Sequence, residues 1–400
     1  MIASPAEANA CHLRAGAALP RKQFEQIRRR MLLEFCKWDP QIEDVSTLAE
    51  FPVYISRGQW RWLAQCAERL TQELIEAERR VIRRPELFRE LAIPPRLRTI
   101  CAEWREEQMS LAGRVMRFDF HPTLDGWKIS EVNSDVPGGY TESTSFTKLM
   151  ADESGGEIAG LPGEEWTNAI AQAADGRRGG VLLVSAAGFI EDFQIVSYMA
   201  QRLRERGVEA RVIGVDQLAT VRAGVIVRFF QAEWLGRLRY KTVARQLLGP
   251  GDVPVMNPGY TIVSESKRFP LIWERIGLPM TIWRSVLPET LDPRDADWKN
   301  GDWLLKTAFC NTGDTVSWAG QKKKRDWRMA RLHARLSPRN WIAQRRFDCQ
   351  AIDTPRGEMF PCLGVYTVGG KACGIYGRLS FGRVVDFRAI DAAVLIGDEE

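Results

Sequence analysis

The sequence lacks the features that most directly indicate a zinc site, a disulfide framework or a membrane span. Its 8 cysteines, at positions 11, 36, 66, 101, 310, 349, 362 and 373, include no C-x-x-C pair, which favours reduced and mostly buried thiols. No apolar run approaches the roughly 18 to 20 residues of a transmembrane helix, and the N-terminal stretch does not have the pattern of a secretory signal. We therefore expect no membrane association and a cytoplasmic location.

Histidine is scarce and the net charge is small. The 3 histidines and 8 cysteines form no local nucleophile signature, which argues against Ser/His or Cys/His catalysis and against an amidase. A net charge of +5, from 56 basic and 51 acidic residues, is too small for this length to indicate nucleic-acid binding. The basic run "QKKKR" at 321–325 is typical of a solvated loop. We expect no nucleic-acid partner, and the oligomeric state stays open.

A chain of 400 residues exceeds the usual size of a single core, so two or three subdomains are expected. Residues 1–112 carry apolar side chains at spacings of three and four, which predicts a helical N-terminal part. Residues 113–175 switch to period two and end in a glycine-rich connection. They predict a pair of strands followed by a linker.

Two further regions complete the expected α/β (α+β) fold. Residues 176–258 contain an apolar strand, a helical stretch closed by Gly207, and two more apolar strands, which is typical of a Rossmann-like layer. Residues 259–400 end in alternating runs with Gly369-Gly370 as a hairpin turn, which predicts an antiparallel sheet.

The strand pair predicted between residues 114 and 133 carries an unusual set of polar side chains. Residues two apart in a strand share a face, so Arg117 and Asp119 point one way, as do Glu131 and Asn133. By count, the loop "HPTLDG" is longer than the tightest turn, which leaves the register open. If the two polar faces meet, one cation and three oxygen-bearing side chains converge.

Two carboxylates and an amide oxygen form a hard ligand set that suits Mg²⁺. An adjacent arginine can hold a phosphate or carboxylate group in bidentate fashion. The alternative is a solvent-exposed hairpin face that carries cross-strand charge pairs. Spacing alone does not decide between the two.

The stretch "RFDF…WKISEVNSDVPGGYTES" resembles the glutathionylspermidine synthase family, whose synthetase domain is an ATP-grasp ligase with a circularly permuted order of its nucleotide-site motifs. The family pattern, Arg-x-Asp, a turn, then Glu-x-Asn-x-Asp-x-Pro, is matched in order by Arg117, Asp119, Glu131, Asn133, Asp135 and Pro137. The resemblance implies ATP and Mg²⁺ as cofactors. It implies Asp119, Glu131 and Asn133 as magnesium ligands, with Arg117 at the reacting phosphoryl group.

Three further segments resemble the nucleotide site of this family. "SESKRFPLIWE" gives Lys267 and "WLLKTAF" gives Lys306 as lysines that meet the phosphates, while "WIAQRRF" places Gln344 by the adenine. Each lysine taken alone is typical of a surface charge. Their order along the chain together with the hairpin is what favours the nucleotide site.

Other segments resemble the substrate-binding elements of the family. "GFIEDFQ" points to Glu191 and Asp192 for the amine, although two acids that open a helix are also explained by the helix dipole. "VIVRFFQAEW" adds Glu233 as a further candidate. "ACGIYGR" gives Arg378 as the residue that binds the carboxylate substrate.

One segment departs from the family pattern. The glycine-rich loop that should cover the phosphates reads "TAFCNTGDTVSW", in which Gly313 is the only glycine, and glycine allows the closest backbone approach to phosphate. The resemblance implies an ATP-grasp-like fold with a Rossmann-like pre-ATP-grasp layer and a helical N-terminal part. It implies an ATP-grasp C–N ligase that joins a peptide-like carboxylate to an amine or polyamine. The alternative is an ATP-binding regulator or scaffold without turnover.

Overall fold

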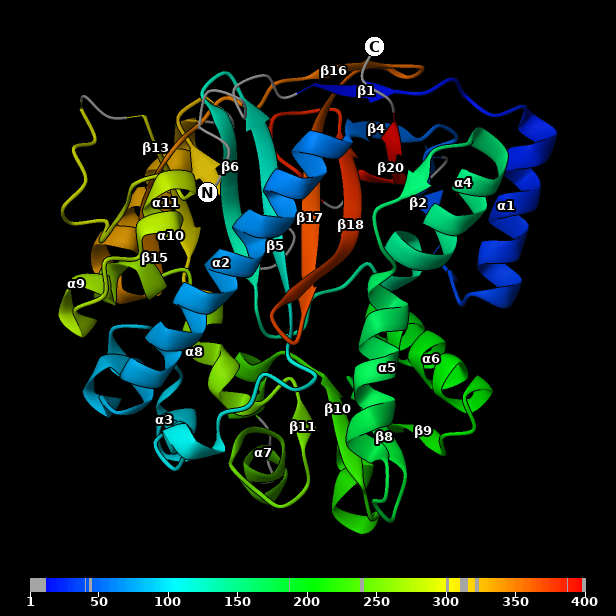
Figure 1. Ribbon diagram of the computed structural model, residues 1–400. Helices are drawn as coiled ribbons and strands as arrows, with labels where there is room; N and C mark the ends of the chain where they lie inside the picture. The colour runs from blue at the N-terminus through cyan, green and yellow to red at the C-terminus, as the bar shows by residue number, and fades with distance from the viewer. Residues whose placement is uncertain are drawn as a thin grey trace.

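The computed structural model describes residues 12–39, 41–42, 45–186, 188–237, 241–299, 302–309, 316–320, 324–386 and 388–397. Within these ranges, no helix combines the length and the apolar character that crossing a bilayer requires. Helices and strands are mixed throughout, and four sheets of four or more strands organise the chain (Figure 1). The expected α/β fold class is confirmed.

The largest sheet lies at the centre of the molecule and has the order β19-β18-β17-β5-β6, with β16 paired to β17 (Figure 1). All its neighbouring strands are antiparallel. The long helix α2 (Arg57–Ile82) crosses one face, where Met116, Phe118 and Phe120 are fully buried. The opposite face of the sheet carries the polar side chains of Arg117 and Asp119. The strands are β5 (Val115–Thr123), β6 (Gly126–Asn133), β16 (Ile352–Thr354), β17 (Gly357–Val368), β18 (Lys371–Ser380) and β19 (Ile390–Ala392).

Two hairpin turns in this sheet can be compared with the sequence. The turn between β5 and β6 contains only Leu124 and Asp125, because Thr123 already pairs with Gly126. The expectation of a longer loop was therefore wrong, since the segment "HPT" continues the strand. The turn at Gly369-Gly370 is confirmed, with φ of +57° and +83°, values that glycine adopts without steric cost.

A second sheet is entirely parallel and has the order β11-β10-β8-β9. It confirms the predicted Rossmann-like layer. The chain moves from β8 to β9 on one side and returns to β10 on the other, so the carboxyl ends of β8 and β10 form a switch point where such sheets bind ligands. The elements are α5 (Pro162–Ala174), β8 (Val181–Ser185), α6 (Ile190–Glu205), β9 (Ala210–Gly214), β10 (Val225–Phe229), α7 (Lys241–Leu248) and β11 (Val255–Met256).

A third, smaller sheet is antiparallel and has the order β12-β15-β13-β14. It lies beside β6 in Figure 1, with the basic helix α11 close to it. The elements are β12 (Thr290–Leu291), β13 (Trp303–Thr307), β14 (Ser317–Trp318), α11 (Lys324–Leu336) and β15 (Trp341–Arg345).

The N-terminal part is helical as predicted, but it also contributes strands that the sequence pattern did not indicate. Its strands β1 and β4 join β7 and β20 in a fourth sheet, β1-β4-β20-β7. The last strand, β20, runs parallel to β4 and antiparallel to β7, so the expected antiparallel run does not hold at the end of the chain. The elements are β1 (Leu13–Ala15), α1 (Arg21–Glu34), β4 (Val53–Ser56), α3 (Pro95–Cys101), β7 (Glu157–Ile158) and β20 (Val394–Gly397).

Short elements connect these layers. The described cysteines at positions 36, 66, 101, 349, 362 and 373 are free thiols. The domain boundaries given above stay a prediction. The connecting elements are β2 (Gln41–Ile42), β3 (Val45–Ser46), η1 (Pro85–Arg89), η2 (Glu106–Gln108), the π-helical turn η3 (Glu142–Phe146), α4 (Thr147–Ser154), η4 (Val215–Thr220), η5 (Ala232–Arg237), η6 (Gly259–Thr261), α8 (Ile262–Glu265), η7 (Phe269–Ile272), α9 (Trp273–Ile276), α10 (Thr281–Val286) and η8 (Pro338–Asn340).

Candidate active site

A cavity of about 320 Å³ lies where the polar face of the large sheet meets the carboxyl end of β10, the start of α6 and the small antiparallel sheet. It gathers most of the residues predicted from the sequence. Gly313 lies outside the described residues, and Lys267 reaches the cavity wall through an ion pair. The predicted residues that line the cavity are Arg117, Asp119, Glu131, Asn133, Glu191, Asp192, Glu233, Lys306, Gln344 and Arg378.

The hairpin pairs in the register that brings its two polar faces together. Arg117 lies opposite Asn133, and Asp119 lies opposite Glu131. Arg117 is 7% exposed and Asp119 is 6% exposed, so this is not a solvated hairpin face. A register shift directly after Asp119 leaves Ser130 without an opposite residue, and such a bulge re-aims the side chains beside it.

Arg117 is held in a fixed orientation by its neighbours. Its Nε and Nη2 donate to the two Asp119 oxygens at 2.7 and 2.9 Å, and Nη1 donates to the Gly138 carbonyl at 3.0 Å. The guanidinium lies 5.3 Å from the Tyr376 ring centre. Gly364 in β17 makes room for this side chain, because a Cβ there would lie 2.6 Å from Arg117 Cδ.

Two lysines converge on Glu131 from other elements. Lys267, which follows α8, forms an ion pair with Glu131 at 3.0 Å. Lys306 on β13 donates to the Ser130 carbonyl at 3.1 Å and is 5% exposed. Burial acts to raise the Glu131 pKa, but the two lysines outweigh it and hold that pKa well below its usual value. Lys306 is therefore a buried lysine and not a surface charge.

The predicted metal ligands are adjacent but already paired with protein groups. Asp119 also accepts a hydrogen bond from Asn133 Nδ2 at 3.0 Å, and Glu131 is paired with Lys267. Among the described residues, no three or more His, Cys, Asp or Glu side chains are grouped to hold a metal ion. Two carboxylates and one amide still provide the oxygen chemistry that Mg²⁺ accepts, since this ion keeps several of its waters.

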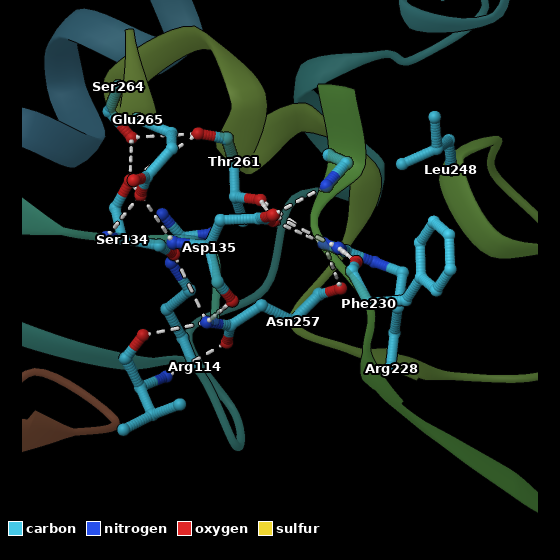
Figure 2. A network of polar contacts seen from close by, with 12 residues as sticks. Arg114, Ser134, Asp135, Arg228, Phe230, Leu248, Asn257, Thr261, Ser264 and Glu265 are labelled. Atoms are coloured by element: carbon cyan, nitrogen blue, oxygen red, sulfur yellow. Dashed lines mark hydrogen bonds and ion pairs between the residues drawn. The ribbon is translucent and has the colours of Figure 1, made fainter. Parts of the chain in front are cut away.

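A buried network fixes the end of β6 to the Rossmann-like sheet (Figure 2). The Asp135 carboxylate pairs with the fully buried Arg228 of β10 and accepts from the Ala232 amide at 2.8 Å and the Thr261 hydroxyl at 2.5 Å. Burial acts to raise the Asp135 pKa, but Arg228 and these hydrogen bonds lower it overall. The hairpin and the turn after β10 therefore share one anchor.

The same network positions the segment that carries Lys267. The Glu265 carboxylate at the end of α8 accepts from the backbone amides of Ser134 and Asp135 at 2.8 and 3.0 Å (Figure 2). Asn257 Nδ2 donates to the Ser134 and Asp135 carbonyls at 3.1 and 2.8 Å. Lys267 lies two residues after Glu265, so its place relative to the hairpin is set by these contacts.

The acidic residues at the other end of the cavity are not neutralised in this way. Asp192, in the first turn of α6, has its pKa raised to about 7 by burial and then by Glu191. Burial, and then Asp135, raises the Glu233 pKa to about 8. Among the described residues, neither Asp192 Oδ2 nor Glu233 Oε2 has a hydrogen-bond partner. A helix dipole alone would lower the pKa of acids in a first turn, so burial dominates here.

Arg378 and Gln344 line the cavity, and each has one buried polar atom without a partner among the described residues. Arg378 Nη2 donates to the Asp386 carbonyl at 3.0 Å, and Gln344 Nε2 donates to Thr290 Oγ1 at 3.0 Å. Arg378 Nε and Gln344 Oε1 are buried and find no partner within the described part of the chain. Buried polar atoms of this kind are satisfied when a ligand or water completes them.

The sequence reasoning missed one cluster in the cavity wall. Lys37 Nζ lies 2.6 Å from Glu142, 3.1 Å from Asp39 and 3.3 Å from Asp391, and Tyr376 donates to Asp391 at 2.6 Å. Glu142 follows closely on the matched hairpin motif and could have been noticed there. Lys37 and Asp391 are 354 positions apart, and no local pattern indicates that they meet.

His121 is a second cavity residue that the sequence did not single out. Its Nε2 lies 3.0 Å from Ser130 Oγ. Burial, opposed by Asp119, lowers the His121 pKa to about 4, so the imidazole is neutral at physiological pH.

Comparison with known proteins identifies the fold and the family. A solved glutathione synthetase-like effector from Globodera pallida, in its apo form, is 13% identical, with a TM-score of 0.63 over 94% of this chain and 96% of that chain; this likeness shows the fold. A putative gamma-glutamylcysteine synthetase from Methylobacillus flagellatus KT is 12% identical, with a TM-score of 0.42 over 78% and 84% of the two chains. The comparison with curated proteins finds no match. The family model "Glutathionylspermidine synthase preATP-grasp" matches residues 19–390, and the chain belongs to this family.

Proposed function

We propose that the protein is an ATP- and Mg²⁺-dependent ligase that joins a peptide-like carboxylate to an amine or polyamine through an acyl phosphate. Its family is one of ATP-dependent ligases. The observation that carries the proposal is the hairpin register, which sets Arg117 and Asp119 opposite Asn133 and Glu131 in a cavity with buried lysines at one end. These are the groups that a phosphoryl-transfer site requires.

The basic residues at the hairpin end suit a triphosphate. Lys267 and Lys306 both lie close to Glu131 and would bind phosphate oxygens, while Gln344 Oε1 would accept from the adenine amino group. Mg²⁺ held by Asp119, Glu131 and Asn133 would neutralise negative charge on the transferred phosphoryl group. Arg117, fixed by Gly138 and Tyr376, would stabilise the acyl phosphate as it forms.

The other end of the cavity suits the two substrates to be joined. Arg378, with its open Nε, would bind a carboxylate of the peptide-like acid. Asp192 and Glu233, with Glu191 beside them, would bind the amine. The ammonium group would give a proton to one of these carboxylates, and the free amine nitrogen would then form the C–N bond to the activated carbonyl carbon. The bond from that carbon to the phosphate oxygen breaks, and inorganic phosphate leaves. No covalent enzyme nucleophile takes part in this scheme.

Phosphate release tests the proposal. We expect release from Mg·ATP to require both an acid and an amine when the protein is assayed with a panel of peptides and polyamines. Asp119→Ala should lower the rate by about 10²–10³-fold, as expected for loss of a charge-stabilising group. Asp125→Ala, at the exposed tip of the same hairpin, is the matched control and should retain activity. ATP binding without release for any substrate pair would instead support the regulator or scaffold.

A further inference from the structure

The start of α6 presents two different surfaces within five residues. Glu191 and Asp192 line the main cavity. Phe189, Ile190 and Phe193 line a separate groove of about 460 Å³ that runs over the ends of β8 and β9, with Val212 and Ile213 in its floor. The acidic cavity wall and the apolar groove are thus the two sides of one short segment.

Large apolar side chains around this segment are exposed. Phe189, Ile190 and Phe193 are 50%, 52% and 46% exposed, and Trp38 is 38% exposed. Together with Trp234, we call these residues the aromatic rim. Grouped apolar side chains beside a polar pocket mark a binding surface, whereas single exposed ones carry no such meaning.

The aromatic rim is built from three separate parts of the chain that contact one another. The Phe193 ring lies 5.7 Å from the Trp38 ring, and the Phe189 ring lies 4.9 Å from the Trp234 ring. Trp38 directly precedes Asp39, and Trp234 directly follows Glu233, and both acids line the cavity. The rim therefore borders the acidic end of the cavity on both sides of the α6 segment.

Contacts below the rim hold it in place. Gln194, which is 4% exposed, accepts from the Asp39 amide at 3.1 Å and from the Trp38 amide. Phe230 packs edge-on against Trp234 with ring centres 5.9 Å apart. A preformed apolar surface loses little conformational freedom when a ligand covers it.

We propose that the amine substrate carries an apolar or aromatic substituent, which lies on the aromatic rim while the ammonium group lies at Asp192, whose Oδ2 has no hydrogen-bond partner among the described residues. The inference rests on the proposed ligase function. An unsubstituted aliphatic amine would occupy only the acidic end and leave the rim exposed. A substituted amine gains about fourfold in affinity for each methylene-sized portion that it buries.

Calorimetric titration with two amines tests this subsite. Butylamine and 4-phenylbutylamine share the ammonium group and the alkyl chain and differ only in the ring. We expect the full-length protein to bind 4-phenylbutylamine at least tenfold more tightly. The double variant Phe189→Ala/Phe193→Ala should lose most of this preference without changing butylamine binding. Leu124→Ala, which alters an apolar side chain that is 79% exposed at the hairpin tip, is the control and should keep the preference.

Three results would overturn the inference. The first is equal affinity for the two amines, and the second is an equal loss for both amines in the double variant. The third is an oligomeric mass that changes in the double variant while the ring preference stays, which would make the rim an interface between copies. Since binding needs no turnover, a ring preference without phosphate release in the presence of any acid supports the subsite and rejects the ligase.

Discussion

The two ends of the cavity differ in how their charges are arranged. At the hairpin end, Asp119 is paired with Arg117, and Glu131 with Lys267, so each carboxylate faces a cation. At the α6 end, Asp192 and Glu233 are half-buried, and one buried oxygen of each has no hydrogen-bond partner within the described part of the chain. The pKa values of their carboxyl groups are raised to about 7 and about 8. The carboxylates of the first end are paired with cations of the protein, whereas those of the second end are not.

Paired carboxylates stabilise the fold, whereas carboxylates without a partner suit a ligand. A buried ion pair holds its geometry whether or not a substrate is present, because removing either partner exposes an uncompensated charge. A buried acid without a partner lowers stability and gains its compensation only when a cation binds. Preorganised charge at one end and unsatisfied acid at the other fit a site that combines fixed chemistry with a recognised amine.

Removing one carboxylate from each environment should change the free energy of unfolding in different ways. Asp135→Ala should lower the free energy of unfolding by about 3–5 kcal/mol, because Arg228 remains buried without its partner. Asp192→Asn should leave that free energy unchanged or slightly higher at pH 8. Its raised pKa means that ionised Asp192 destabilises the folded state above its ordinary pKa. Urea unfolding of both variants measures this. Equal losses would show that the two environments do not differ.

The affinity for an amine should depend on pH. Amine binding should strengthen about tenfold between pH 6 and pH 9, because Asp192 and Glu233 ionise through about 7 and about 8 while an alkyl ammonium stays charged. Glu131, whose pKa is held low by its lysines, stays ionised over this range. Calorimetry with butylamine at four pH values measures the effect. Asp192→Asn should flatten the lower part of the profile, and an unchanged profile in that variant would contradict the assignment.

The smallest effect is expected at the nucleotide base. Gln344→Ala should weaken ATP binding by roughly 3- to 10-fold, since a neutral hydrogen bond to the adenine amino group contributes about 0.5–1.5 kcal/mol. GTP, which has no amino group at that ring position, should bind equally to both proteins. Arg345→Ala is the matched control, because this neighbouring side chain pairs with Glu289 instead. A loss for both nucleotides would point to a general distortion of β15.

The sequence predicted the hairpin end better than the α6 end, for a physical reason. A period of two assigns each residue of a strand to a face, so Arg117 and Asp119 could be placed together, and Glu131 and Asn133 likewise. Whether these two faces pair stayed open, because it depends on the length of the turn. Its two-residue length was misjudged because the polar segment "HPT" reads as loop although it continues the strand.

Contacts between distant segments account for what could not be predicted. Lys37 reaches Asp391 across 354 positions, and Trp38 meets Phe193 only because the loop after α1 lies against α6. Neither residue carries a local pattern that indicates its partner. The strands β1, β4 and β20 are 3, 4 and 4 residues long, too short for periodicity to reveal them. Gly313 lies outside the described residues, so the role of its loop over the phosphates stays a prediction.

The sheet β1-β4-β20-β7 has a consequence for the order of folding during translation. Strand β4 is made early, but its parallel neighbour β20 comprises residues 394–397. A nascent chain that still lacks these residues leaves β4 paired only with β1, so an unpaired strand edge stays available to other chains. That edge closes only once residues 394–397 have left the ribosome and paired with β4.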